Sequence, residues 1–155
     1  MTKYLPPSVR GCFSKLAESY TLRTAMAPEK KTMRLHPDNI GRFAAALIEL
    51  ERFSHRTIEI GGEPLMAEQV ARAISEASGR EIAVDHIPGD VAERLAPSNP
   101  QIDSQVWFWE RQDGIEPREL EAEFGFKLTT FKEFLTANQE LMRETFGNLD
   151  ATYAF

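Results

Sequence analysis

The stretch that most constrains the fold runs from His36 to Ile48, where an apolar stripe follows a helix start. Apolar residues recur there at positions i, i+3, i+4, i+7 and i+8, which lie on one face of a helix: Ile40, Phe43, Ala44, Leu47 and Ile48. Asp38 is placed to cap this helix, because its carboxylate can accept the free N–H groups of the first turn. Gly41 costs about 1 kcal/mol relative to alanine inside a helix. Its presence predicts that another backbone passes close by.

Two segments after this helix alternate like strands, and a second amphipathic helix lies between them. Thr57 to Ile60 alternates before the glycine pair Gly61-Gly62, and Glu81 to Ile87 alternates before Pro88. The second helix carries a core stripe of Met66, Val70, Ala73, Ile74 and Ala77. Gly79 follows that stripe and ends the helix as a C-terminal glycine. These patterns predict the order strand, helix, strand.

A β-hairpin is predicted for residues 20–35. Tyr20 to Thr24 and Lys31 to Leu35 both alternate, and Ala27 to Lys30 forms a turn with proline at its second position. The hairpin would lead directly into the helix that begins at Asp38.

The last third of the chain predicts helices. The segment from Pro97 to Pro100 breaks helical structure. A helix carrying Val106 to Trp109 is expected to follow it and to end near Gly114. Thr130 and Glu133 form a predicted capping box, in which each residue bonds the backbone of the other, and this box opens the final helix.

These segments, in this order, resemble the C-terminal half of NmrA-like proteins, which are atypical short-chain dehydrogenases/reductases. The family's "(H)PxDIG" and "T-(Y/I)-x-(I/L)-x-G" motifs are matched by His36 to Gly41 and by Thr57 to Gly61. Its "L-(S/T)-x-x-E-(I/V)-A" and "G-R-x-(I/V)" motifs are matched by Leu65 to Ala71 and by Gly79 to Ile82. Phe126 to Leu135 is similar to the family's last helix. The resemblance implies the substrate-side half of that fold.

The predicted fold class is therefore α/β, or α+β, with short strands and a hairpin packed with about five helices. The resemblance implies a truncated NmrA-like fold without the GxxGxxG Rossmann half. With 155 residues the chain is expected to form a single domain, residues 1–155, large enough for a hydrophobic core. Residues 1–18 and 144–155 are expected to be flexible.

Composition disfavours several classes of protein. The net charge of −6 argues against nucleic-acid binding, which needs clustered Lys and Arg. The sole cysteine, Cys12, permits no intramolecular disulfide, which fits a reducing cytoplasm. No apolar run approaches the roughly 20 residues of a membrane span, and the first residues lack a signal-peptide pattern. We therefore expect a cytoplasmic protein that binds neither nucleic acid nor a membrane.

No cofactor is expected. NmrA-like proteins bind NADP through a glycine-rich turn in an N-terminal half that has no counterpart in this sequence. The glycine pair Gly61-Gly62 is followed by Glu63, whose charge would repel a phosphate group. No two histidines stand at metal-ligand spacing, and a lone cysteine makes no zinc site.

Five residues are candidates for a small-molecule site. His86 is the first candidate for an acid or base, because it alternates with apolar residues and should be half-buried. Asp85 precedes it on a strand, so the two side chains should point to opposite faces. His36 is a second candidate, although a structural role at the helix start is the simpler interpretation. The candidates for a ligand-binding wall, which would equally suit a core or an interface, are Tyr20, Trp107 and Trp109.

Two functions from different classes remain open. In the first, the chain binds a small hydrophobic or aromatic molecule between the residue 82–88 strand, the residue 107–109 segment and the residue 20–35 hairpin. Such a protein could be a cofactor-independent isomerase, cyclase or dehydratase, and the sequence leaves open whether it is an enzyme. In the second, it is a non-catalytic interaction or regulatory subunit that completes a separate Rossmann-bearing partner. A homodimer is expected in either case, since uncovered strands and helices would leave apolar surface in water.

Overall fold

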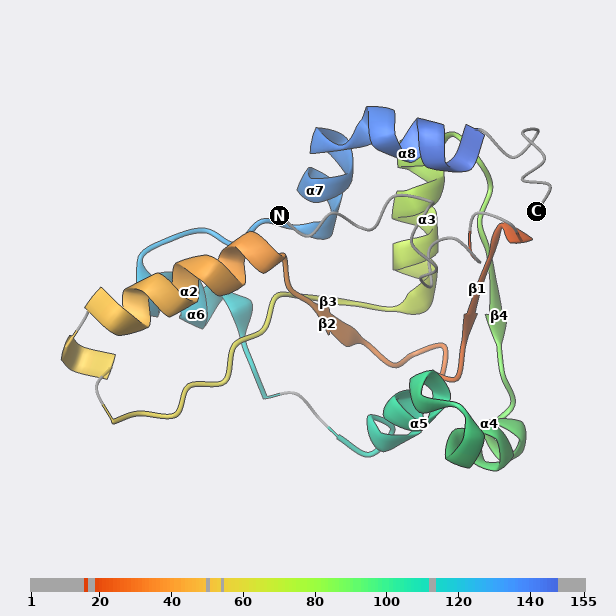
Figure 1. Cartoon of the computed structure of the whole chain (residues 1–155), viewed down its shortest axis with the longest axis horizontal. Helices are drawn as coiled ribbons and strands as arrows, with labels where there is room; N and C mark the ends of the chain where they lie inside the picture. Colours follow the sequence, from red (N-terminus) through yellow and green to blue (C-terminus); the bar gives the residue numbers. More distant parts are fainter. Residues whose placement is uncertain (1–15, 17–18, 50, 54, 112–113, 148–155) are drawn as a thin grey trace.

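The computed structural model of the chain describes residues 16, 19–49, 51–53, 55–111 and 114–147. Within them the architecture is mixed α/β, as expected, with seven α-helices and four short strands (Figure 1). Cys12 and most of the two expected flexible ends lie outside the described residues. None of the described helices combines the length and apolar character that crossing a bilayer requires.

The four strands form two separate two-stranded sheets. β1 (Thr21–Thr24) pairs in parallel with β4 (Ala83–His86), and the two lie side by side in Figure 1. β2 (Thr32–Arg34) pairs antiparallel with β3 (Glu63–Leu65). The predicted hairpin of residues 20–35 is therefore wrong: both of its strands exist, but each pairs with a later segment. Alternation identifies a strand without identifying its partner, and a parallel partner requires a long crossover connection.

The segment around Ile58 and Ile60 forms no strand, contrary to expectation, and the strand begins only at Glu63. Gly62 lies at the start of this pairing. A Cβ atom placed on Gly62 would lie 2.0 Å from the carbonyl oxygen of Arg34, so β2 approaches the backbone here more closely than any side chain permits. The backbone of residue 62 is therefore fixed against β2 directly before β3.

Helix α2 (Pro37–Glu49) is capped by His36 and not by Asp38. The imidazole Nδ1 of His36 accepts the backbone N–H of Asp38 at 3.1 Å, and the His36 carbonyl accepts the N–H of Asn39 at 2.9 Å. Asp38 lies two residues after the cap position, within the first turn, where its charge still suits the positive end of the helix.

The apolar stripe of α2 is not its buried face. Phe43 is 1% exposed, but Ile40 is 47% and Ile48 is 85% exposed. Phe43 packs edge-on against Phe124 of α6 (Pro117–Phe124), with ring centroids 4.8 Å apart. Only this side of α2 is covered by α6 and by the short η1 turn (Glu51–Phe53). The prediction of a close backbone at Gly41 is also wrong for the described part of the chain, where nothing lies within 4 Å of a Cβ atom built there.

The largest core surrounds helix α3 (Ala67–Ser78), and the expected stripe is confirmed at Val70, Ala73, Ile74 and Ala77, whereas Met66 lies just before the helix. Ile74 has no exposed surface, and Gly79 ends the helix with a φ of 72°. The predicted last helix is divided at Asn138 into α7 (Phe131–Ala137) and α8 (Gln139–Gly147), and both pack on α3 (Figure 1). The capping box of Thr130 and Glu133 is confirmed. Phe146, expected in a frayed end, is completely buried.

A smaller core, separate from the α3 core and from the packing of α2 on α6, is formed by α4 (Gly89–Leu95), the η2 turn (Ala96–Ser98) and α5 (Pro100–Trp107). The Asn99 side chain caps α5 by accepting the N–H groups of Gln101 and Ile102. Helix α5 therefore starts where the sequence breaks, but it ends at Trp107 and not near Gly114.

Candidate functional site

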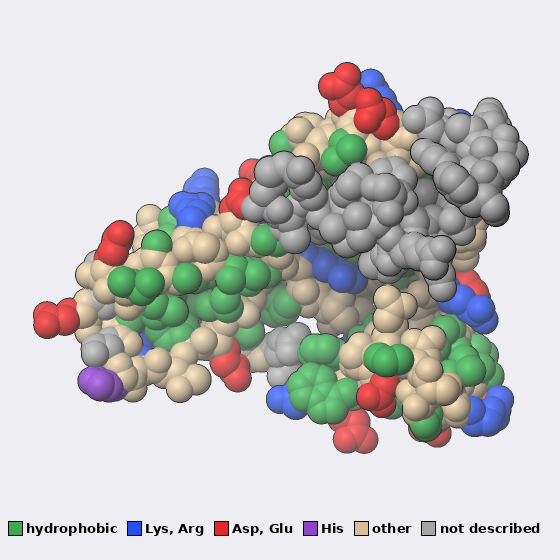
Figure 2. All heavy atoms as spheres, in the orientation of Figure 1, with side chains coloured by type: hydrophobic (Ala, Val, Ile, Leu, Met, Phe, Trp, Pro, Cys, Tyr) green, Lys and Arg blue, Asp and Glu red, His purple; other side chains and the backbone are tan. Residues whose placement is uncertain are grey.

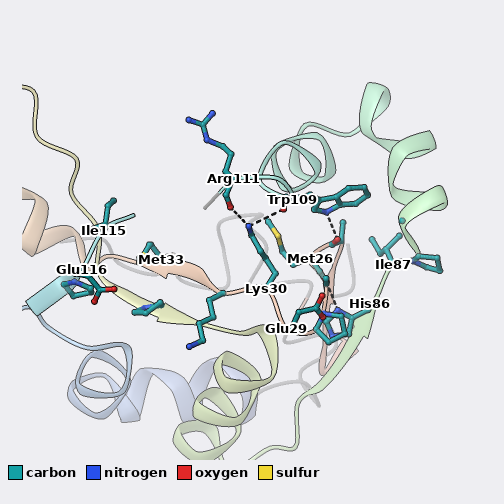
Figure 3. A pocket seen from close by; sticks show the side chains of 18 residues that line it. Met26, Glu29, Lys30, Met33, His86, Ile87, Trp109, Arg111, Ile115 and Glu116 are labelled. Carbon is teal, nitrogen blue, oxygen red and sulfur yellow. Dashed lines mark hydrogen bonds between the residues drawn. The ribbon is translucent and has the colours of Figure 1, made fainter. Parts of the chain in front are cut away.

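A cavity with a volume of about 900 Å³ lies at the carboxyl ends of β1 and β4 (Figure 3). Its walls come from residues 25–31, which follow β1, from the end of β4 and the residues after it, 86–89, and from Trp109, Arg111 and residues 115–117. Met33 of β2 and Pro64 of β3 complete the lining. The carboxyl end of parallel strands is where ligands bind in open α/β sheets, because the connecting loops diverge there.

The end of β1 is held in place by α5. The side-chain oxygen of Gln105 accepts the hydroxyl of Thr24 at 2.9 Å and the backbone N–H of Ala25 at 2.7 Å. Beyond α5, the indole N–H of Trp109 donates to the carbonyl of Ala25 at 2.9 Å. Two side chains thus fix the first residues of the cavity wall.

Lys30 joins two walls of the cavity. Its ammonium donates to the carbonyl oxygen of Trp109 at 3.3 Å and to that of Arg111 (Figure 3). The guanidinium of Arg111 extends away from Lys30 and stacks over the ring of Trp107, 3.8 Å from its centroid. The residue 25–31 loop and the segment after α5 are therefore tied together at the cavity.

His86, the last residue of β4, uses both ring nitrogens. Nδ1 lies 2.7 Å from the carbonyl oxygen of Met26, and Nε2 lies 2.7 Å from Oε1 of Glu68 in the first turn of α3. A carbonyl only accepts, so Nδ1 carries a proton. The remaining proton lies between Nε2 and Glu68.

Electrostatics place that remaining proton on the histidine. The hydrogen bond that His86 donates to Glu68, followed by the one that it donates to the Met26 carbonyl, raises the pKa of His86. The same bond to His86 is the main cause of the lowered pKa of Glu68. These shifts favour the imidazolium–carboxylate form of the pair over its neutral form. Asp85 points to the opposite face of β4, where it pairs with Arg23 at 3.0 Å.

Of the five residues singled out from the sequence, the structure brings two together at this cavity: His86 and Trp109. Trp107 is 57% exposed and lies outside the lining. Tyr20 packs against the α3 core and donates its hydroxyl to the Phe146 carbonyl at 3.3 Å. His36 borders a separate cavity of about 230 Å³ and contacts Phe134, with ring centroids 5.3 Å apart.

Three residues important to this geometry were not found from the sequence: Glu68, Gln105 and Lys30. Their partners are 18, 81 and 79 residues away along the chain, respectively. Only a correct pairing of β1 with β4 would have shown that these segments meet. In the part of the chain that the structure describes, no three His, Cys, Asp or Glu side chains are grouped to hold a metal ion.

The fold is similar to one part of larger α/β enzymes. It matches a nucleoside-diphosphate-sugar epimerase of Staphylococcus aureus with a TM-score of 0.60 and 16% identity, over 79% of this chain and 46% of that one. It also matches the triphenylmethane reductase of Citrobacter sp., complexed with NADP(H), with a TM-score of 0.62 and 16% identity, over 81% of this chain and 46% of that one. This chain therefore spans less than half the length of either protein, and the likeness establishes the fold alone. No family model and no curated protein sequence matches it.

Proposed function

We propose that this chain is a small-molecule-binding protein of the NmrA-like type, and that its ligand occupies the cavity at the carboxyl ends of β1 and β4. The observation that carries the proposal is the position of this cavity at the ends of two parallel strands. The order of motifs in the sequence and the likeness in fold to a reductase and an epimerase both support it.

The size and lining of the cavity suit a small apolar or aromatic molecule. Its volume of about 900 Å³ falls within the range of about 300–1,000 Å³ of typical ligand sites. Apolar side chains dominate the walls, among them Met26, Met33, Ile87 and Trp109. A few polar groups remain to orient a ligand. The sequence offers no glycine-rich turn for a pyrophosphate, so the proposed ligand is not a dinucleotide.

The geometry favours a binding function over a function in which His86 catalyses proton transfer. A general base needs a free ring nitrogen directed at the substrate, and both nitrogens of His86 are engaged, by Met26 and by Glu68. Cofactor-independent isomerisation, cyclisation or dehydration would require one of these bonds to open. We therefore assign His86 a positioning role, in which it holds the Met26 wall.

Titration calorimetry with a panel of small aromatic compounds tests the proposal. Met33→Trp, which fills the cavity, and Trp109→Ala, which removes one wall, should each weaken binding at least tenfold. Trp107→Ala is the matched control, because Trp107 lies outside the lining, and it should leave binding unchanged. Equal affinities for Met33→Trp and the unaltered protein, with both folded by circular dichroism, would refute binding in this cavity.

The exposed face of α2 supports the expected self-association. Three of the five large hydrophobic side chains that are exposed in the described residues lie on this helix: Ile40, Leu47 and Ile48. Figure 2 shows hydrophobic side chains gathered along it. Soluble monomers seldom leave such a patch in water. We propose that a second copy of this chain covers it, as in the expected homodimer.

A further inference from the structure

The ammonium of Lys30 is a cation with an unused donor in the cavity wall. An ammonium has three N–H donors, and two of them are directed at the carbonyls of Trp109 and Arg111. Among the described residues, no carboxylate pairs with Lys30. Within the described part of the chain, its positive charge is therefore offset by carbonyl dipoles alone, and one N–H is free to bind a ligand.

The other charged groups of the lining leave Lys30 as the main electrostatic feature. His86 is already paired with Glu68 at 2.7 Å, and the Arg111 guanidinium stacks on Trp107 outside the lining. The carboxylates of Glu29 and Glu116 and the ammonium of Lys31 belong to exposed residues, where water screens them strongly, whereas Lys30 is half-buried. A charge interacts more strongly where water is partly excluded.

A flat apolar surface lies in the same cavity. The ring of Trp109 is held by its bond to Ala25, so it is a fixed wall. Met26 and Met33 also line the cavity, and thioether sulfurs make favourable contacts with aromatic rings. A ring system is therefore the shape that this wall would accept best.

We propose that the ligand is an aromatic anion, with its ring against Trp109 and an anionic oxygen on the ammonium of Lys30. This inference rests on the proposed function, since it names the chemical class of the molecule in the same cavity. A charged hydrogen bond between an ammonium and an oxyanion is about twice as strong as a neutral one, which gives selectivity for charge.

A series of naphthalene derivatives of different charge tests the inference on the unaltered protein. Calorimetry at pH 7.5 and low salt would compare 2-naphthoate, neutral 2-naphthamide and cationic 2-naphthylmethylammonium. The anion should bind at least tenfold more tightly than the amide, and the cation most weakly. Equal affinities of naphthoate and naphthamide would overturn the inference but leave the cavity proposal intact. No binding of any member at millimolar concentration would instead refute the proposed function itself.

Two variants then assign the preference to Lys30. Lys30→Met should reduce the preference for naphthoate over naphthamide to less than twofold. Lys132→Met carries the same change in net charge on an exposed residue of α7, outside the cavity, and should keep the full preference. If Lys30→Met also keeps it, Lys30 is not the anchor. If Lys30→Met does not fold, salt added to the unaltered protein should weaken the binding of naphthoate and leave the binding of naphthamide unchanged. Affinities that do not respond to salt in this way would count against the inference.

Discussion

His86 Nε2 lies 2.7 Å from Glu68 Oε1, so the end of β4 is joined to the first turn of α3. The other ring nitrogen binds the carbonyl of Met26 in the wall of the cavity. One imidazole therefore links a strand, a helix and the loop after β1. This link depends on the ionisation of both partners, which gives it a pH dependence.

The first prediction concerns that pH dependence. The pKa of His86 is raised by folding. Its contribution to the stability of the fold is therefore fully present below the ordinary value of about 6.5 and is lost as the pH rises through the raised pKa. The pKa of Glu68 is lowered, so its contribution is present above about 4.3 and is lost as the pH falls through the lowered pKa. The ion pair therefore stabilises most in the weakly acidic range.

Urea unfolding of the unaltered protein and of Glu68→Gln, measured from about pH 4 to 9, checks this. The unaltered protein should be more stable by about 1 kcal/mol or less near pH 6, because both side chains are partly exposed, and the difference should shrink toward pH 9. Glu76→Gln, an exposed residue of the same helix, is the control. Stability curves for Glu68→Gln and Glu76→Gln that run parallel would rule out the pair as a source of pH dependence.

The second prediction contrasts two glycines. Gly62→Ala should destabilise the fold by about 3 kcal/mol or more, because its Cβ would lie 2.0 Å from the Arg34 carbonyl and backbone must move. Gly41→Ala should stabilise it by up to about 1 kcal/mol, because the site is helical and none of the described residues lies within 4 Å of the added Cβ atom. Chemical denaturation of both variants measures the change in the free energy of unfolding, which should have opposite signs. A destabilising Gly41→Ala would mean that another surface contacts this side of α2.

The contrast between these glycines shows what a local pattern can predict. The α3 stripe, Gly79 and the Thr130–Glu133 capping box were predicted correctly, because each depends on residues within one helix or its first turn. The importance of Gly62 was missed, since it arises from β2 on a distant segment. The same reason explains the wrong hairpin: alternation marks β1, but its partner is β4.

The candidate site shows the same limit. His86 and Trp109 could be singled out because residue type and position in the sequence already mark them. Glu68 and Gln105 could not, since each acts through a partner that only tertiary structure brings near. The exposed stripe of α2 is a related case: periodicity shows that a helix has an apolar face, but not whether its own chain covers that face.

The third prediction tests self-association through α2. Leu47→Lys should convert a dimer into a 17.6 kDa monomer in light scattering, because a charge at a covered apolar face costs several kcal/mol. Leu95→Lys on α4 is the matched control, since Leu95 and Leu47 are both 38% exposed. If the unaltered protein is a monomer at micromolar concentration, or if both variants stay dimeric, α2 is not the interface between two copies.

The last prediction concerns the support of the cavity wall by Gln105. Its side-chain oxygen accepts from both the Thr24 hydroxyl and the Ala25 N–H, and these two residues are 8% and 4% exposed. Gln105→Met keeps the length of the side chain but offers no comparable acceptor, so two buried donors lose their partner. An unsatisfied buried donor costs about 1–3 kcal/mol, and the variant should lose about 2 kcal/mol in urea unfolding. Gln101→Met makes the same change on the exposed face of the same helix and should cost less than about 0.5 kcal/mol.

Because Ala25 begins the wall against Trp109, Gln105→Met should also weaken the binding of aromatic ligands, whereas Gln101→Met should not. Equal stabilities of the two variants would show that α5 does not hold the end of β1.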